Sequence, residues 1–141
     1  MNEIALSSRV RLLGSSLQLP ADLTLEEWAA VGPVLGGITD CVQWAIGDWL
    51  NYGETRFGEA YAQFAELREW KPQTLLNWKY VSHAYPPDER QSLSFGHHAT
   101  VAKFQSEERS EWLEKAEAQK WTVEEFREAV HGETKLGQTF T

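Results

Sequence analysis

The sequence contains a single cysteine, Cys41, among its 141 residues. A disulfide bond within the chain is therefore impossible, which excludes the class of small proteins held together by such bonds. Because Cys41 lies among apolar residues, we interpret it as a small buried hydrophobic side chain. No signal peptide is recognised, since Glu3 and two arginines interrupt the apolar pattern of the start. No uninterrupted apolar run approaches membrane-spanning length, so a cytoplasmic protein without membrane contact is expected.

Motifs for catalysis and for metal binding are also missing. There is no nucleophile motif, and Gly36-Gly37 is not a phosphate loop because no strand is expected before it and no lysine follows. No spacing of histidine and cysteine matches a zinc motif. His97 and His98 are adjacent, so on a helix they point in different directions, and we interpret them as one packing and one surface histidine. We therefore expect neither an enzyme nor a bound metal or other cofactor.

Positive charge is scarce, with 13 Lys and Arg residues against 21 Asp and Glu residues and a formal net charge of −8. The excess acid is unevenly placed: residues 1–53 and residues 105–128 each carry a net charge of −4, whereas residues 54–104 are balanced. A surface of this kind would give little non-specific affinity for DNA. The balanced middle of the chain is the part in which a DNA contact is least opposed.

Large apolar side chains are plentiful, since hydrophobic residues make up 42% of the chain and seven residues are tryptophan. A hydrophobic core can therefore form, and a chain of this length suits one domain. The apolar spacing predicts an all-α fold, a helix-turn-helix-containing bundle of six or seven helices with a short N-terminal β arm or hairpin. We expect the arm or hairpin over residues 1–21, the helical domain over residues 22–132 and a flexible tail over residues 133–141.

Two predicted helix starts share one design, a capping box of threonine and glutamate enclosed by two hydrophobic staple residues. The residues are Leu23, Thr24, Glu27 and Trp28 in the first start, and Trp121, Thr122, Glu125 and Phe126 in the second. Gly32-Pro33 is expected to bend or end the first of these helices, and the apolar spacing of residues 38–52 predicts another. The last helix is expected to end at Gly132.

Two further segments have the lengths of a helix-turn-helix. Residues 59–68 would form its first helix and residues 72–84 its second, with Pro72 at the first helical position and a proline pair after the end. If Leu75, Trp78 and Val81 face inward, the second helix presents four outward side chains. These are Gln73, Thr74, Asn77 and Tyr80.

The outward side chains have the chemistry that reads bases in the major groove. Asn77 and Gln73 can each hydrogen-bond an adenine, and Thr74 can contact a thymine methyl group or a phosphate. Phosphates could be held by three cations, Lys71, Lys79 and Arg68. The alternative is an ordinary core helix with a polar outer face, and the pattern alone leaves both open.

The remaining expectations concern the C-terminal third and two side chains of the central helix. Residues 94–104 should form a short helix, and Ser106 should cap the next helix, which turns Trp112, Leu113 and Ala116 inward. The acidic residues of the last two helices form a solvated face or a surface for a basic partner. Asp48 is either a polar anchor or an exposed residue, and Trp44 lies off the main apolar stripe, which makes it a candidate for a subunit interface.

The order of the motifs resembles the LmbU-like family of bacterial and phage helix-turn-helix regulators. The segments that carry the resemblance are "SLQLPADLTLEEW", "WAIGDWLNYGETRFGEAY", "QTLLNWKYVSHAYP" and "LSFGHHATVAKFQSEERSEWLEKAEAQKWTVEEFREAV", and the resemblance covers roughly residues 16–130. The last third is also similar to the helix-turn-helix domain of ParB-type partition proteins. The resemblance implies a sequence-specific, DNA-binding transcriptional regulator whose reading helix is residues 72–84.

The expected partners are double-stranded DNA and a second copy of the chain, because one short helix reads only a few base pairs and a dimer on a palindrome reads more. The alternative is an acidic protein-interaction module that keeps the fold without reading DNA. Such a module would bind a protein partner through the acidic helices.

Overall fold

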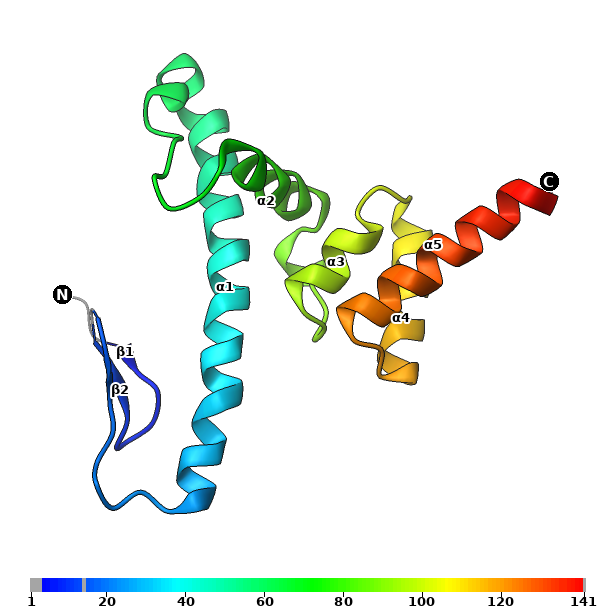
Figure 1. The fold of residues 1–141 in the computed structure, drawn as a ribbon. Helices are drawn as coiled ribbons and strands as arrows, with labels where there is room; N and C mark the ends of the chain where they lie inside the picture. The colour runs from blue at the N-terminus through cyan, green and yellow to red at the C-terminus, as the bar shows by residue number, and fades with distance from the viewer. Residues whose placement is uncertain (1–3, 14, 141) are drawn as a thin grey trace. The chain divides into compact units, whose positions relative to one another are not determined.

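The computed structural model describes residues 4–13 and 15–140, and for residues 133–140 it describes the backbone only. The chain divides into two compact units, Met1–Val42 and Gln43–Thr141. Figure 1 shows the elements along the chain. In order, they are β1 (Ile4–Ala5), β2 (Arg11–Leu12), β3 (Leu17–Gln18), α1 (Leu25–Phe57), the 3-10 helix η1 (Gly58–Gln63), α2 (Pro72–Ala84), the 3-10 helix η2 (Pro87–Glu89), α3 (Phe95–Val101), α4 (Ser106–Gln119) and α5 (Val123–Phe140).

The described part of the chain is predominantly helical, as predicted, but it has five α-helices instead of six or seven. The reduction comes from α1, which joins two helices that the sequence suggested were separate. A further predicted helix, over residues 59–68, does not form as an α-helix. The predicted division into arm, domain and tail stays a prediction. The boundary between the two compact units, after Val42, is a different division of the chain.

The first unit begins with a small antiparallel sheet in the order β1-β2-β3. Ile4 pairs with Leu12, and Leu12 pairs in turn with Leu17. The sheet has three strands, one more than the hairpin that the sequence predicted. Val10, just before β2, is only 1% exposed, and Val31 is the other buried apolar residue among the described residues of this unit.

The capping box at the start of α1 is confirmed. The backbone N–H of Glu27 donates to Thr24 Oγ1 and the backbone N–H of Thr24 donates to Glu27 Oε1, both at 3.1 Å. Arg9 donates from Nη1 to the same glutamate at 3.1 Å and also bonds Asp22. The backbone N–H of Thr24 and these neighbours hold the pKa of the Glu27 carboxyl below its usual value. The box therefore fixes both the first turn of the helix and the loop before it.

Pro33 does not bend or end the helix, contrary to prediction, because α1 continues through it. Proline in a helix interior removes one backbone hydrogen bond and crowds the carbonyl of the residue four positions back. Here that residue is Ala29, which is exposed, so water can satisfy its carbonyl group. The interruption is therefore tolerated.

The first half of α1 is apolar yet largely exposed. Val31 is buried, but Val34 is 41% exposed and Trp28 is 60% exposed. Cys41 is also exposed, so its interpretation as a buried residue was wrong. The apolar stretch that follows is interrupted by Asp40, as the absence of an uninterrupted membrane-spanning run predicts. By length and composition alone, the helical stretch from Leu25 is apolar enough to cross a membrane, and 6% of its most apolar window is buried.

In the second unit α1 crosses α2 at close range. A Cβ atom on Gly47 would lie 2.4 Å from the Trp78 carbonyl oxygen and 2.0 Å from Ser82 Oγ, so only glycine fits there. Leu50, one turn later, is 2% exposed. The side chain of Asn51 donates to the Lys79 carbonyl oxygen at 2.9 Å. The crossing sets the position of α2 against α1.

Gly58 ends α1. Its φ of +56° lies in the left-handed region, which costs glycine little and is common just after the end of a helix. Residues 59–68 were predicted as an α-helix, but η1 covers only Gly58–Gln63 and residues 64–71 are not helical. No residue of η1 is buried, so the apolar spacing of this segment has no core to pack against. The first helix of the predicted helix-turn-helix is therefore replaced by η1 and a non-helical connection with a turn.

The core of the second unit gathers around α3. Its buried side chains come from α2, α3, α4 and α5, and include Val81, Val101, Leu113 and Phe126. Trp44 packs edge-on against Phe95, with ring centroids 4.6 Å apart. Trp44 is half-buried and packs against this core, and its place at a subunit interface stays a prediction.

Both adjacent histidines are buried, so the interpretation of one of them as a surface residue was wrong. His97 is 7% exposed and its Nε2 lies 2.8 Å from the Trp121 carbonyl oxygen. His98 is fully buried, and its Nε2 accepts the backbone N–H of Gln91 at 3.0 Å. The two histidines point in different directions from α3, and both are buried because α4 and α5 pack against this helix.

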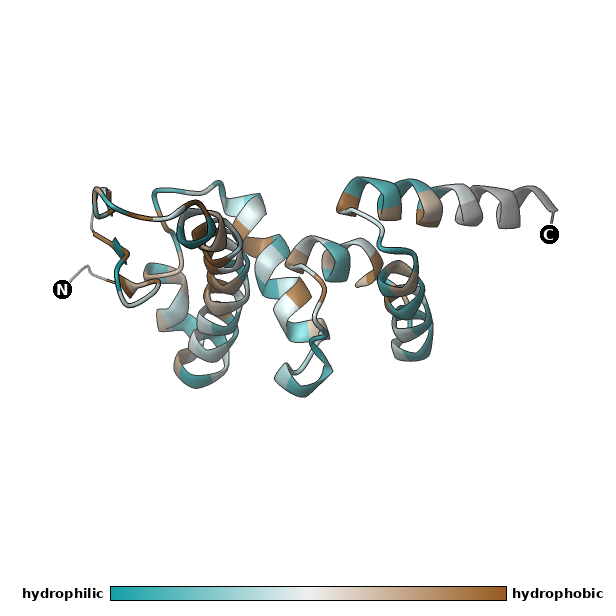
Figure 2. Ribbon diagram, turned by 90° about the horizontal axis from the view of Figure 1, so that it is seen from below, coloured by the Kyte–Doolittle hydropathy of each residue, from teal (hydrophilic) through white to brown (hydrophobic). Residues whose placement is uncertain are grey.

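The predicted inward face of α4 is confirmed, since Leu113 and Ala116 are buried and Trp112 packs on the core. Most other positions of this helix are hydrophilic (Figure 2). The prediction that Ser106 caps this helix was wrong, because Gln105 is the N-cap residue. Helix α3 ends at Val101, earlier than residue 104.

The second predicted capping box, at the start of α5, is confirmed. The backbone N–H of Thr122 donates to Glu125 Oε1 at 2.9 Å, and Trp121 stacks on Phe126 as a staple residue. The predicted end at Gly132 was wrong, because the backbone of α5 stays helical to Phe140. The flexible tail over residues 133–141 stays a prediction, and Thr141 lies outside the described residues.

Candidate nucleic-acid interface

One side of α2 faces solvent along its whole length. The exposed residues recur every three or four positions and so lie on one stripe. They are Gln73, Leu76, Asn77, Tyr80 and His83. The opposite side carries buried Leu75 and Val81 and packs into the second unit. The sequence predicts this orientation, except that Thr74, which we expected to face outward, is half-buried at the border.

The two amides of this stripe are joined by a hydrogen bond. Gln73 donates from Nε2 to Asn77 Oδ1 at 3.0 Å, an i,i+4 bond that aligns the two side chains. The Gln73 carbonyl oxygen and the Asn77 amide nitrogen then have no protein partner among the described residues. One acceptor and one donor side by side match the N6 amino group and the N7 atom of adenine in the major groove.

Tyr80 is 54% exposed, but its hydroxyl donates to the Ala102 carbonyl oxygen at 3.3 Å. The ring is thus anchored by its polar end, and its exposed edge offers an apolar surface beside the amides. Such a surface suits a thymine methyl group better than a hydrogen bond to a base edge.

The N-terminal end of α2 is open to an anion. Lys71 is the N-cap residue and makes no capping bond with its side chain, Pro72 fills the first position, and the first turn holds no acidic residue. The free N–H groups of a helix start and its dipole favour phosphate. Lys71 and Arg68 are exposed and make no ion pair within the part of the chain that the structure describes. Both cations remain available to a phosphate backbone.

Lys79 differs from the other two cations, because Glu54 of α1 already pairs with it at 3.0 Å. The lysine side chain is 20% exposed and the glutamate side chain 55% exposed. A phosphate approaching Lys79 would therefore compete with a carboxylate of the same chain. Nothing in the sequence pattern signalled this pair, since 25 positions separate the two residues and Glu54 lies beyond the predicted end of its helix.

Of the two interpretations of Asp48, the polar anchor is correct, although its side chain is also half-exposed. Its two carboxylate oxygens accept from Arg90 at 2.7 and 2.9 Å. Arg90 also donates to the Tyr85 carbonyl oxygen at 2.9 Å and lies over the Trp44 ring. This arginine joins α1 to the end of α2 and so supports the candidate interface from behind.

A second pair of helices, α3 and α4, is also joined by a short turn, over residues 102–105. Its second helix is unsuited to DNA, because α4 exposes several glutamates and has two in its first turn. A row of carboxylates would repel phosphates. Of the two, α2 therefore has the better surface.

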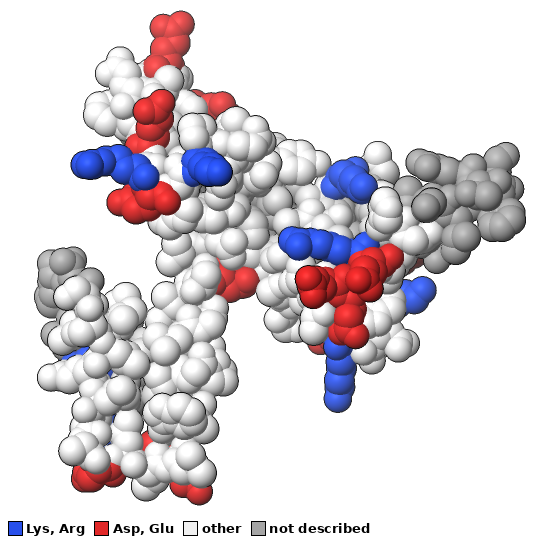
Figure 3. All heavy atoms as spheres, in the orientation of Figure 1, with Lys and Arg blue, Asp and Glu red and all other residues white. Residues whose placement is uncertain are grey.

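Charge of both signs lies on one face of the second unit. On the face drawn in Figure 3, Lys and Arg side chains lie near the end of α1 and over the α3–α5 region, with acidic side chains among them. No broad basic patch forms on this face. Within the described residues, no group of three His, Cys, Asp or Glu side chains could hold a metal ion.

One curated protein is similar to this chain over most of its length. It is the transcriptional regulator NovE of Streptomyces niveus, 34% identical over 115 residues. The match covers 81% of this chain and 53% of that protein, so the chain spans about half the length of its relative. No family model matches the chain. No solved structure matches it either.

Proposed function

We propose that the chain is a transcriptional regulator that binds double-stranded DNA through the exposed stripe of α2. The similarity to the transcriptional regulator NovE carries the proposal. The amides of Gln73 and Asn77 read bases, with Thr74 and Tyr80 beside them, and Lys71, Lys79 and Arg68 hold phosphates. A regulator of this kind needs no catalytic group and no cofactor.

The proposed motif is a helix-turn-helix in which α2 is the reading helix and the end of α1 with η1 takes the place of the first helix. The close crossing at Gly47 supports it, because a reading helix must be held rigidly against a second helix. The balanced charge of residues 54–104 makes DNA contact at α2 less unfavourable than at the acidic helices.

The proposed active form is a homodimer. The stripe of α2 is 13 residues long at most, so one copy reads only a few base pairs. The exposed apolar surface on the first half of α1, with Trp28 and Val34, supports association with a second copy. Dimerisation would place two reading helices on the two halves of a palindrome.

The test is fluorescence anisotropy of the purified chain with random and with selected duplexes, at low and at moderate salt. Asn77→Ala is compared with Gln119→Ala, which removes an exposed amide from α4 instead. We expect Asn77→Ala to weaken binding to the selected duplex about tenfold, the value of one bidentate base contact, and Gln119→Ala to leave it unchanged. Lys71→Ala should lower the slope of log affinity against log salt by about one.

Two results would contradict the proposal at different levels. If the native chain binds no duplex even at low salt, DNA binding itself is wrong, and a protein partner of the acidic helices becomes the function to test. If the native chain binds a preferred sequence but Asn77→Ala behaves like Gln119→Ala, the chain binds DNA through another surface. Both variants must retain the native far-ultraviolet circular dichroism spectrum.

A further inference from the structure

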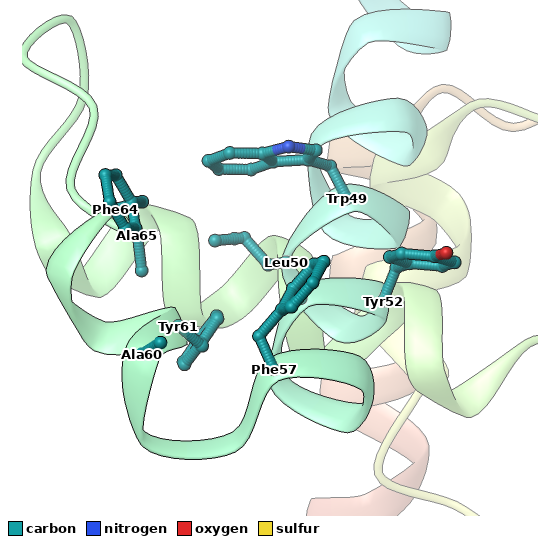
Figure 4. Close-up of a pocket in the computed structure, with 9 residues that line it drawn as sticks. Trp49, Leu50, Tyr52, Phe57, Ala60, Tyr61, Phe64 and Ala65 are labelled. Carbon is teal, nitrogen blue, oxygen red and sulfur yellow. The ribbon is translucent and has the colours of Figure 1, made fainter.

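A cavity of about 410 Å³ lies between the last turns of α1 and the segment that follows it (Figure 4). Five aromatic side chains line it, with Trp49, Tyr52 and Phe57 on α1 and Tyr61 and Phe64 opposite. The volume falls within the range of pockets that bind small molecules, about 300–1,000 Å³. The proposed contact with DNA uses none of these residues.

The lining contains no charged side chain, and it is almost entirely apolar. A charged ligand would lose part of its hydration there without gaining an oppositely charged partner, which disfavours its binding. Two potential donors belong to lining residues, the indole N–H of Trp49 and the hydroxyl of Tyr61, whereas the Tyr52 hydroxyl points away from the other lining residues (Figure 4). The ligand that fits is uncharged and carries one or two hydrogen-bond acceptors.

The aromatic lining selects a flat ligand. Tyr52 and Phe57 already form an edge-to-face pair with centroids 6.4 Å apart. The other aromatic lining residues are Trp49, Tyr61 and Phe64. Tyr52, Phe57 and Phe64 are each more than half exposed, so their rings meet water when the cavity holds no ligand. An aromatic ring placed among them would bury apolar surface and add edge-to-face or offset-stacked ring contacts.

The α1 wall of the cavity is held in place without a ligand. Leu50, which lines it, is 2% exposed. On the same two turns, Asn51 donates to the Lys79 carbonyl oxygen and Glu54 pairs with the Lys79 ammonium group. The opposite wall contains no buried residue in η1 and would gain packing from an occupant. One fixed wall and one poorly packed wall suit a pocket that closes on its ligand.

We propose that this cavity is a binding site for an uncharged, planar aromatic small molecule with one or two hydrogen-bond acceptors. The site is independent of the proposed DNA contact, since none of the α2 stripe residues lines it.

The experiment is a titration of the full chain with 2-naphthamide in the absence of DNA, followed by nuclear magnetic resonance of the tryptophan indole N–H groups. We expect the Trp49 signal to shift saturably, with a Kd of about 1 mM or below, because the ligand buries apolar surface in the cavity. The isosteric anion 2-naphthoate should bind at least tenfold more weakly because the lining has no cation. Ala65→Trp, which fills the cavity, should weaken binding at least tenfold.

The control is Ala62→Trp, which adds the same side chain to exposed η1 outside the lining. It should bind 2-naphthamide like the native chain. If Ala65→Trp fails to fold, Phe64→Ala replaces it, because Phe64 is 69% exposed and its loss should weaken binding without unfolding the chain. The proposal is overturned if no saturable shift occurs, if 2-naphthoate binds equally well, or if both tryptophan variants behave alike. It is also overturned if the Trp49 signal shifts with protein concentration alone, which would make a second copy the occupant.

Discussion

The two halves of α1 have similar apolar character but different surroundings. In the second half, Gly47 lies under Ser82 and the backbone of Trp78, and Leu50 is 2% exposed. In the first half, a Cβ atom added to Gly32 or Gly36 would meet nothing within 4 Å. Packing therefore requires glycine at position 47, whereas positions 32 and 36 have room for a larger side chain.

The difference teaches that helix formation and helix packing are separate consequences of one sequence. Local signals, above all the capping box at Thr24, start the helix whether or not a partner covers it. Residues 28–47 include one charged side chain, Asp40, and this stretch has little buried surface. An exposed apolar surface of that extent is typical of a site of association.

The largest effect is expected where the helices are closest. Gly47→Ala would place a methyl group 2.4 Å from the Trp78 carbonyl oxygen, which cannot move without separating α1 from α2. We expect the free energy of unfolding to fall by about 3 kcal/mol, the upper part of the range for overpacking. Urea unfolding followed by circular dichroism measures it. A loss under about 1 kcal/mol would show that the crossing is looser than the distances indicate.

The next effect concerns the arginine that joins the second half of α1 to the end of α2. Arg90→Met removes two bonds to Asp48 and leaves the Tyr85 carbonyl oxygen without that donor. We expect a loss of about 2–3 kcal/mol in the free energy of unfolding, typical of bonds to a mostly buried charged group. Arg56→Met is the control, because Arg56 lies near the exposed Phe57 ring and should contribute less than about 0.5 kcal/mol. Equal losses in the two variants would contradict the role of Arg90.

Several elements could be predicted from the sequence because their causes are local. Both capping boxes form as predicted, and α2 begins at Pro72 and ends before the proline pair. The outward stripe of α2 follows from helical periodicity and the bulk of its apolar residues. The placement of Gln73 and Asn77 on one exposed surface is therefore open to prediction, although their use in DNA reading stays a proposal.

The failures have causes that lie outside the local pattern. Residues 59–68 have helical spacing, but Gly58 ends α1 with a positive φ and no core covers the segment. Cys41 has apolar neighbours, but the helix that carries it is exposed there. The pairing of Lys79 with Glu54 depends on how α1 crosses α2, which a single sequence does not encode in any spacing. These three outcomes depend on which part of the chain packs against each element, and no local pattern contains that information.

A smaller effect should appear in alkaline solution, where the core behind α1 titrates. Burial raises the pKa of Tyr85 to about 12, and its hydroxyl donates to the His98 carbonyl oxygen at 2.8 Å. Since the unfolded chain loses this proton near pH 10, the contribution of Tyr85 is fully present below pH 10 and is lost between about pH 10 and 12. Tyr85→Phe should therefore be less stable than the native chain by about 1 kcal/mol at neutral pH. The difference should shrink over that range of pH; a constant difference in urea unfolding would contradict the assignment.

A still smaller effect concerns the carboxylate that competes for Lys79. Glu54→Gln removes the ion pair, which at a partly exposed site is worth at most about 1 kcal/mol, and frees the lysine for a phosphate. If α2 binds DNA as proposed, we expect a rise in affinity of about threefold in the anisotropy measurement. Glu59→Gln is the matched control, since it removes the same charge from exposed η1. Equal gains in the two variants would show that only net charge matters.

The smallest effect is expected in the uncovered half of α1, and its sign is informative. Gly36→Ala adds a methyl group that meets nothing within 4 Å, while alanine favours the helix over glycine by about 0.5–1 kcal/mol. In dilute solution, where the chain is a monomer, the variant should therefore be more stable than the native chain by about that amount. If a second copy packs closely on Gly36, the same methyl group would disturb the contact, so self-association measured by analytical ultracentrifugation would weaken while the monomer gains stability. Unchanged association would place the dimer contact elsewhere on the chain, and a loss of monomer stability would mean that this half of the helix is covered after all.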